Sequence, residues 1–506
     1  MLLSQNVWKI YGLKGNPFDV RALSLVSETL LPISKAFVGR SHESKESQII
    51  TNLLRNPGGA CVAIEGDIGV GKTTFVNYHR FLWENEALDK LFTPIQEIGL
   101  AFHGNIKNFM MNILDSLICK IMVLSDADAI MKKVPLFQEI LILSKVYFKK
   151  NLQIEGGAFG FNFGVVKNEF ISVPEVSENQ LLWYFQQMVQ EIKKLGYAGI
   201  FLHFDNLEVV ARQETTRLRL FFEQIRDILQ TPDVYFIFVS YRGFFSEIIT
   251  PLERVRSIFF GYPIYISPLK QEEVIEAIEK RYSLLSNGSF FCKPIEDAFI
   301  IYLYKLFKGK IRFIMDSINT LVPNLVLTKP ITLTCKDACQ YLLKMTKERL
   351  NSITQKEREI LEFAAHQETF TNQKICQTFH MPASNVTRTL QSLQQGNLIY
   401  PNHQAGKYIY YCISEELRII QENTLSQPES FPYPKSNLSI HDKAIQFLQS
   451  FSQKEFTAQE YQKAAGIAAS TARLYLNRFL KQGIICRKGK GRATRYQNSP
   501  LGMENL

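Results

Sequence analysis

The chain has 506 residues, of which 46% are apolar and 21% charged, so we expect a soluble globular protein of about three or four domains. This composition excludes a disordered, collagen-like or coiled-coil chain. No run approaches the ~18 apolar residues that cross a bilayer, and residues 1–18 lack the apolar block of a signal peptide, so we expect a cytoplasmic protein without membrane contact. Only Cys335 and Cys339 of the eight cysteines lie close together, which favours reduced thiols over a zinc site.

The net charge of +10 is concentrated at one end of the sequence. Residues 431–506 contain twelve lysines and arginines against four acidic residues, and the remaining 430 residues are close to neutral. A compact basic end on a neutral body predicts a polyanionic partner at that end.

Three short apolar segments indicate the architecture of residues 1–265. The segments 61–65, 199–205 and 234–240 are predicted as buried strands, and amphipathic helices separate them. Strands that alternate with helices predict a parallel α/β sheet. Residues 266–345 have helical periodicity and predict a small second unit made of helices.

Two further features subdivide the chain. The glycine-rich stretch 151–173 alternates apolar and polar residues, which predicts a β-hairpin inserted into the α/β domain. Beyond residue 352, the segments 383–399 and 469–485 resemble each other, and a linker rich in Pro and Ser, 425–437, lies between them. The domains expected in this part of the chain are 352–423 and 438–506.

A phosphate-binding loop is the strongest motif in the sequence. It fits the pattern G-x-x-x-x-G-K-[ST] and lies between a predicted strand and a predicted helix that continues with Thr74. Glycines let backbone N–H groups turn toward phosphate oxygens, and the helix N-terminus favours the anion. We expect Lys72 to contact the β- and γ-phosphates of ATP and Thr73 to hold Mg²⁺. The motif consists of Gly66, Asp67, Ile68, Gly69, Val70, Gly71, Lys72 and Thr73, and we expect these residues and the following Thr74 to bind the nucleotide.

The second predicted strand ends in a carboxylate that suits the same chemistry. Asp205 follows four apolar or aromatic residues and is expected to hold the Mg²⁺ with its water shell. Asn206 stands where many ATPases place a glutamate that orients the attacking water, which predicts slow hydrolysis. Glu208 is a further candidate for contact with that water.

Four other residues are candidates for contact with the γ-phosphate. Ser240 ends the third strand, and Arg312 opens a helix of the small α-helical unit, from which it could close over the phosphate. Arg254 and Arg256 lie in the loop after the third strand and could act across a subunit interface, although each is as readily a solvated surface arginine.

These residues together resemble the AAA+ ATPases, within them the origin-recognition and replication-initiator branch and its STAND and transposition-associated relatives. The resemblance covers about residues 1–345 and also rests on the segments 11–18 (YGLKGNPF) and 37–40 (FVGR). It implies a P-loop core with a helical lid at 266–345, in which Arg312 is the second sensor arginine. It also implies that Val38, Gly39 and Arg40 lie beside the adenine and ribose.

The two related segments each have the layout of a winged helix-turn-helix. In the second, a helix capped by Ser470 buries Ala472, Leu476, Phe479 and Leu480, and a basic hairpin follows it. The first has six basic against seven acidic residues over 351–423, so unlike the second it is nearly neutral. It is therefore either a DNA-binding or a protein-binding copy. The predicted DNA-binding residues are Ser470, Thr471, Arg473 and Asn477 for the major groove, and Arg487, Lys488, Lys490, Arg492 and Arg495 for phosphates.

Two functions remain open at this point. The first is an ATP-dependent switch, an oligomer of this chain that binds duplex DNA through its C-terminal winged helices. The alternative is a STAND-type sensor whose winged helices mediate protein contacts or autoinhibition. The inserted stretch 151–173 is either packing or a surface for a partner or DNA. A fast motor ATPase is disfavoured by Asn206.

Overall fold

The computed structural model divides the chain into two compact units, residues 1–422 and 423–506. No helix among the described residues combines the length and the apolar content that crossing a lipid bilayer requires. The structure describes residues 7–25, 29–40, 43–99, 106–155, 176–207, 215–288, 291–325, 329–405, 408–423, 455–465, 472–473, 476–477, 479–480, 485–489 and 494–498.

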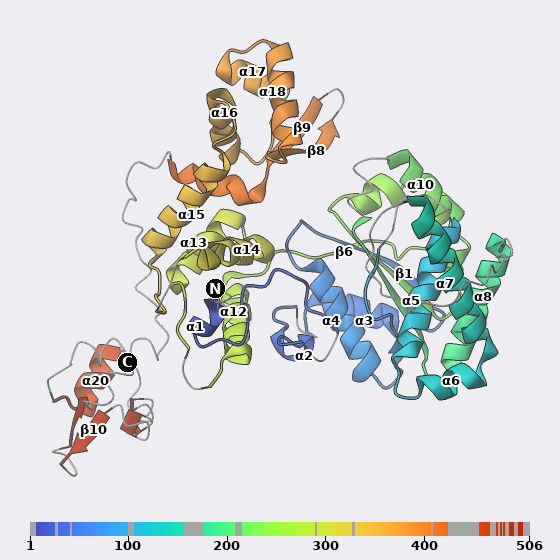
Figure 1. Ribbon diagram of the computed structural model, residues 1–506, viewed down its shortest axis with the longest axis horizontal. Coiled ribbons are helices and arrows are strands. Elements are labelled where there is room, and N and C mark those ends of the chain that lie inside the picture. Colours follow the sequence, from blue (N-terminus) through green and yellow to red (C-terminus); the bar gives the residue numbers. More distant parts are fainter. Residues whose placement is uncertain are drawn as a thin grey trace. The chain divides into compact units, whose positions relative to one another are not determined.

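A parallel β-sheet forms the centre of the α/β part of the first unit, as predicted (Figure 1). Its strand order is β2-β4-β5-β1-β6, and β3 also pairs with β4. Because the strands are parallel, the chain leaves β1, β4 and β5 at the same edge of the sheet. The strands are β1 (Ala60–Glu65), β2 (Leu91–Phe92), β3 (Ile98–Gly99), β4 (Gly199–Asp205), β5 (Val234–Ser240) and β6 (Ile264–Tyr265).

Alternate residues of the central strands serve two separate hydrophobic cores. On β5, Phe236 and Phe238 pack with the larger core, and Ile237 and Val239 pack with the smaller one. Helices α3 (Lys45–Leu54) and α4 (Lys72–Asn85) cover the smaller core. The period of two in the strand sequence thus places a layer of helices on each face of the sheet.

Within the described residues, four helices lie between β3 and β4, in the long separation of Thr73 from Asp205. They pack onto the larger core. The hairpin predicted at 151–173 is wrong in its first residues, because residues 151–155 continue α7, and its remainder lies outside the described residues. The four helices are α5 (Ile106–Met122), α6 (Ala127–Lys133), α7 (Pro135–Glu155) and α8 (Glu178–Lys194).

Short helical segments join the last strands of the sheet. A π-helical segment follows β5. The backbone N–H groups of Gly243, just before this segment, and of Phe245, its first residue, donate to the carboxylate of Glu65 at 3.0 and 2.5 Å. This contact ties the end of β1 to the segment beyond β5. The connecting segments are α10 (Thr215–Gln224), η1 (Ile228–Gln230), η2 (Phe245–Ile249) and α11 (Glu253–Arg256).

The α-helical unit has its own hydrophobic core and includes the start of the chain. Trp8, Tyr11, Leu13 and Phe18 are buried in this core, although the sequence assigned residues 1–265 to the α/β domain. The Tyr11 hydroxyl donates to the Ile331 carbonyl at 3.1 Å. The helices are α1 (Val7–Ile10), α12 (Gln271–Leu285), α13 (Asp297–Phe307), α14 (Ile311–Leu321), η3 (Val322–Asn324) and α15 (Cys335–Arg349). The short helix α2 (Ile33–Ala36) belongs to a separate small cluster that contacts both α4 and α12.

The first unit ends in a small α+β module around a separate core. Three helices pack against the antiparallel sheet β7-β9-β8, and Val386, Leu390 and Leu393 are the buried face of α18. The elements are α16 (Gln355–Ala365), β7 (Phe370–Thr371), α17 (Asn372–Phe379), α18 (Ala383–Gln395), β8 (Ile399–Ala405), β9 (Tyr408–Ile413) and η4 (Glu415–Asn423).

The second unit has a small core of its own. It contains α20 (Ala458–Ala465), helical residues between 472 and 480, and an antiparallel hairpin of β10 (Ile485–Lys488) and β11 (Arg495–Asn498). Ala472, Leu476 and Phe479 are at most 2% exposed, and Leu480 packs beside them, as the helical periodicity predicts.

Candidate nucleotide-binding site

The glycine-rich loop of residues 66–73 leaves β1 at the carboxyl edge of the sheet and turns directly into α4. Gly69 and Gly71 have φ angles of 84° and 92°, a left-handed conformation that glycine adopts readily. Gly69 also lacks room for a side chain, since a Cβ would lie 3.0 Å from Phe313 and 3.1 Å from the Arg312 Cβ. The loop can therefore direct backbone amides at an anion, next to the N-terminus of a 14-residue helix.

Lys72 lies within the curve of this loop. Its Nζ donates to the carbonyl oxygens of Gly66 at 2.9 Å and Asp67 at 3.0 Å, and the residue is 7% exposed. The ammonium group is thus held at the centre of the loop, on the side where a phosphate group would be cradled.

Thr73 and Asp205 meet although 132 positions separate them. The Thr73 hydroxyl donates to Asp205 Oδ2 at 2.5 Å, and Asp205 is 6% exposed at the end of β4. Hard oxygen ligands are those that Mg²⁺ prefers, and the ion usually keeps several waters when it binds phosphates. The two side chains therefore fit a magnesium site beside the loop. No cluster of three or more metal-binding side chains occurs elsewhere in the described part of the chain.

Asn206 lines the same cavity and has a left-handed backbone, with φ of 65°. Asparagine tolerates this conformation better than most residues. The backbone N–H of Asn206 donates to Asp205 Oδ1 at 2.7 Å, which orients that carboxylate. Glu208, the other candidate for contact with the attacking water, lies outside the described residues.

The helical unit contributes to this cavity through the start of α14. The Arg312 amide donates to the Gly69 carbonyl at 3.1 Å, and Arg312 lines the cavity beside Ile311 and Met315. The structure thus brings the predicted second sensor arginine onto the P-loop.

Three further residues predicted near the γ-phosphate do not line the cavity. Ser240 is fully buried, and its hydroxyl has no hydrogen-bond partner among the described residues. Arg254 and Arg256 are exposed on α11. They do not serve the site of their own chain, and contact with a second chain stays a prediction.

The segment 38–40 lies at the other wall of the cavity. Val38 and Arg40 line it, and Gly39 packs against Leu269 of the helical unit. The Arg40 guanidinium donates to the carbonyls of Val70, at 2.9 Å, and of Ser267. Burial lowers the pKa of Arg40 to about 10, so it remains protonated at neutral pH and links the P-loop to the helical unit.

Sequence reasoning missed a third wall of the cavity. Residues 19–23 form it, and the guanidinium of Arg281 on α12 holds this segment by donating to the carbonyls of Pro17 at 3.2 Å and Asp19 at 2.7 Å. Burial lowers the pKa of Arg281 to about 10. The missed lining residues are Asp19, Val20, Arg21, Ala22, Leu23, Ala36, Phe37, Leu269, Ala277, Arg281, Ile311 and Met315.

The lining of the cavity has the chemistry of a nucleotide site. Apolar side chains such as Phe37, Val38 and Met315 line one part, and the P-loop, Lys72 and Arg312 line the other. An aromatic base with a polyphosphate group matches this division.

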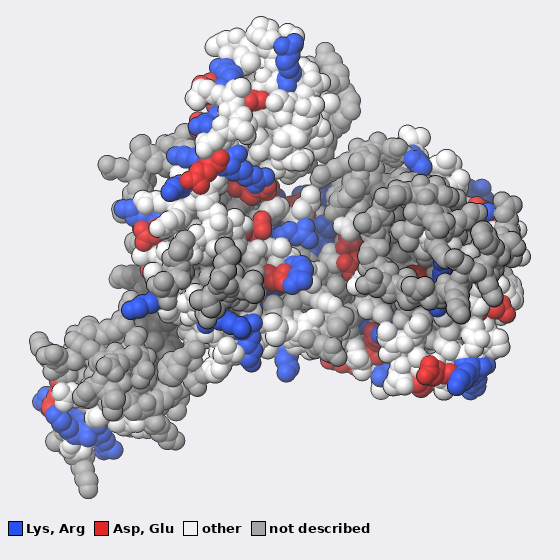
Figure 2. Space-filling model, viewed as in Figure 1, with Lys and Arg blue, Asp and Glu red and all other residues white. Residues whose placement is uncertain are grey.

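The predicted DNA-binding residues lie in the second unit. Arg473 and Asn477 are exposed on the helical face opposite the buried Ala472 and Leu476, and Arg487, Lys488 and Arg495 are exposed on the hairpin. Figure 2 shows basic side chains of this unit gathered on the visible face. The Lys488 ammonium forms an ion pair with Glu455 at 2.9 Å. Ser470, Thr471, Lys490 and Arg492 lie outside the described residues.

The parallel strand order, the P-loop after β1 and the helical unit against that loop define the class of fold: the chain has a parallel α/β core with a P-loop and a helical unit that contacts this loop, as the sequence predicted. Among solved structures it is similar to the ORC2 protein of Aeropyrum pernix in ADPNP–ADP complexes, at 13% identity and a TM-score of 0.41, covering 81% of this chain and 99% of that one.

Two further solved structures share this similarity. A Walker-type ATPase of Pyrococcus abyssi has 12% identity and a TM-score of 0.40, covering 80% of this chain and 99% of that one. The ORC1 protein of Aeropyrum pernix in complex with DNA has 10% identity and a TM-score of 0.40, covering 78% of this chain and 95% of that one. No family model and no curated protein matches the sequence.

Proposed function

We propose that this protein is an ATP-binding switch of the origin-recognition-like AAA+ type that binds duplex DNA through C-terminal winged helices. The observation that carries the proposal is the convergence of Lys72, the Thr73–Asp205 pair and Arg312 on one cavity. ATP would lie with its phosphates on the P-loop and its base against the apolar wall beside Val38. Thr73 and Asp205 would hold Mg²⁺, which supplies charge neutralisation at the β- and γ-phosphates.

The second unit supports the DNA-binding half of the proposal. Its exposed Arg473 and Asn477 lie on one face of a helix, and its basic hairpin follows directly, the order of a recognition helix and a wing. The module at 352–423 has the same order of elements with few basic side chains, which suits a protein partner or a weak DNA contact.

Assembly and turnover complete the proposal. The exposed Arg254 and Arg256 suit contact with the nucleotide of a neighbouring copy in a homo-oligomer, because they lie away from the cavity of their own chain. Hydrolysis is slow because Asn206 offers an amide where a water-orienting carboxylate serves other ATPases.

A titration of labelled duplex DNA with the full chain, with and without ATP and Mg²⁺, tests the proposal. The switch requires salt-dependent binding that changes in affinity or stoichiometry with ATP. ATP binding without any affinity for DNA would favour the STAND-type sensor instead.

Replacement of Asn206 by glutamate should raise the rate of ATP hydrolysis, because the carboxylate can orient and partly deprotonate the attacking water. The left-handed backbone should cost the variant about 1–2 kcal/mol in stability. Steady-state phosphate release measures the effect, and Asn206→Ala is the control that lacks both groups. A wild-type rate of ~1 s⁻¹ or more would show that Asn206 is no brake.

A further inference from the structure

The segment η4, at the end of the first unit, is shared by two hydrophobic cores. Leu417 and Ile420 are buried in the core of the 352–423 module, and Ile419 is buried in the core of the helical unit. In a 3₁₀-helix residues three apart lie on the same side, so Leu417 and Ile420 face one core and Ile419 faces the other. A movement of η4 would therefore disturb the packing of both cores.

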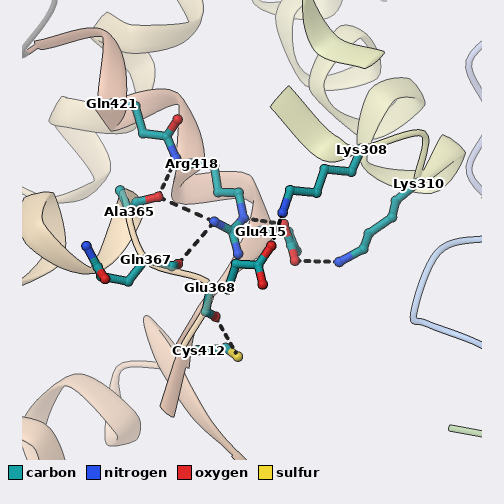
Figure 3. Close-up of polar contacts among 9 residues, drawn as sticks. All are labelled: Lys308, Lys310, Ala365, Gln367, Glu368, Cys412, Glu415, Arg418 and Gln421. Atoms are coloured by element: carbon teal, nitrogen blue, oxygen red, sulfur yellow. Dashed lines mark hydrogen bonds and ion pairs between the residues drawn. The ribbon is translucent and has the colours of Figure 1, made fainter. Parts of the chain in front are cut away.

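A buried charge cluster lies beside this packing (Figure 3). Glu415 is 7% exposed, and its carboxylate accepts from Lys310 at 2.7 Å and from Arg418 at 2.6 Å. Burial alone would raise the pKa of Glu415, yet the two cations hold it below its usual value, so the carboxylate is ionised at neutral pH. Removal of one partner from such a cluster leaves a buried charge uncompensated.

The cluster is anchored firmly on the side of the module. Arg418 also donates to the carbonyls of Ala365 at 3.3 Å and Gln367 at 3.4 Å, and Gln421 donates to the same Ala365 carbonyl. Glu415 is thereby fixed to the C-terminal end of α16, and it presents its free lone pairs to Lys310 of the helical unit.

Lys310 transmits this contact to the P-loop because it directly precedes α14. Two residues further on, the Arg312 amide donates to the Gly69 carbonyl. The turn before Lys310 packs closely against the segment at Leu269, since a Cβ on Gly309, at φ of 75°, would lie 2.7 Å from the Leu269 carbonyl oxygen. Three consecutive residues, Lys310 to Arg312, thus connect Glu415 to the phosphate-binding loop.

We propose that Glu415 is a positioning residue that holds Lys310, and with it the start of α14 and Arg312, against the P-loop. The nucleotide site is then complete only when the 352–423 module is docked on the helical unit. A ligand that shifts this module would change ATP affinity, and ATP would by reciprocity favour the docked module. This inference rests on the proposed function, since it assigns the regulation of the same site.

The neighbouring pair of Lys308 and Glu368 offers a matched control (Figure 3). It joins the same two parts of the chain, but the side chains are 64% and 82% exposed. Solvated pairs of this kind contribute little, so Glu368→Gln should leave ATP affinity at the wild-type value.

The test measures ATP affinity and the dissociation rate of a fluorescent ATP analogue in the full chain. We expect Glu415→Gln and Lys310→Met each to weaken ATP binding at least ~fivefold, with faster dissociation. The double variant should be no weaker than the single ones, and each change should cost less in an Arg312→Met background than in the wild type, because the part of the loss that comes from the Arg312 guanidinium is already absent there. A merely structural role would instead give additive losses.

Two outcomes separate this inference from the proposed function. The positioning role is wrong if the wild type binds ATP and Glu415→Gln and Lys310→Met bind it with the same affinity. It is also wrong if their losses of ATP affinity add fully to the loss in Arg312→Met. In both cases the P-loop assignment stands. If the wild type fails to bind ATP, the proposed function is wrong and the inference falls with it. Lys310→Met gives the answer by itself should Glu415→Gln fail to fold.

Discussion

Lys72→Ala should lower the affinity for ATP by at least ~100-fold, which corresponds to about 2.8 kcal/mol. Lys72 holds its ammonium group inside the P-loop by contacts to Gly66 and Asp67, where it would meet the β- and γ-phosphates. Loss of the charge therefore removes a direct contact with the ligand and takes no side chain from a hydrophobic core. Isothermal titration with ATP and Mg²⁺ measures the affinity, and circular dichroism checks that the variant is folded.

Lys45→Ala is the matched control for this experiment. Lys45 is the first residue of α3, as Lys72 is of α4, but it is exposed and does not line the cavity. It should bind ATP as the wild type does. An unchanged affinity in Lys72→Ala would show that the P-loop does not hold the nucleotide phosphates.

Neutralisation of the basic hairpin should almost abolish duplex binding. Each lost phosphate contact reduces the slope of log affinity against log salt by roughly 0.9, so five lost contacts reduce it by up to about 4.5. The loss should be similar for all DNA sequences, because phosphate contacts do not read bases. Fluorescence anisotropy over a series of salt concentrations measures the slope. The changes are Arg487→Gln, Lys488→Gln, Lys490→Gln, Arg492→Gln and Arg495→Gln.

Two comparisons make that result specific. Lys132→Gln with Lys133→Gln, on the exposed end of α6, should leave DNA binding unchanged. Arg473→Ala or Asn477→Ala should cost about 1–3 kcal/mol on a preferred site and relax its sequence choice. If the hairpin variant binds DNA as tightly as the wild type, the basic surface faces solvent or a protein, and the sensor alternative gains support.

Features that depend on neighbouring residues could be predicted from the sequence. The strands of residues 61–65, 199–205 and 234–240 were predicted because each is a local run of apolar residues. The P-loop was predicted because its glycines have a fixed local spacing. The burial of Ala472 and Leu476 followed in the same way from helical periodicity.

Features that depend on distant residues could not be predicted in this way. Arg281 and the cavity wall at 19–23 meet across some 260 positions, and no local motif signals a guanidinium that binds backbone carbonyls. The alternation that begins at Leu152 was misinterpreted in its first residues, because α7 continues through residue 155 and a helix that is already formed extends more readily than a new strand begins. The rest of the predicted hairpin lies outside the described residues.

The burial of Trp8, Tyr11 and Phe18 among residues of α12 to α15 has a consequence for biosynthesis. The partners of these aromatic side chains lie about 260 or more residues further along the chain and are synthesised that much later. At roughly 5–20 residues per second, the N-terminal segment waits at least ~13 s before its core can close. During that interval its apolar side chains are open to chaperones, and the nucleotide cavity lacks one of its walls.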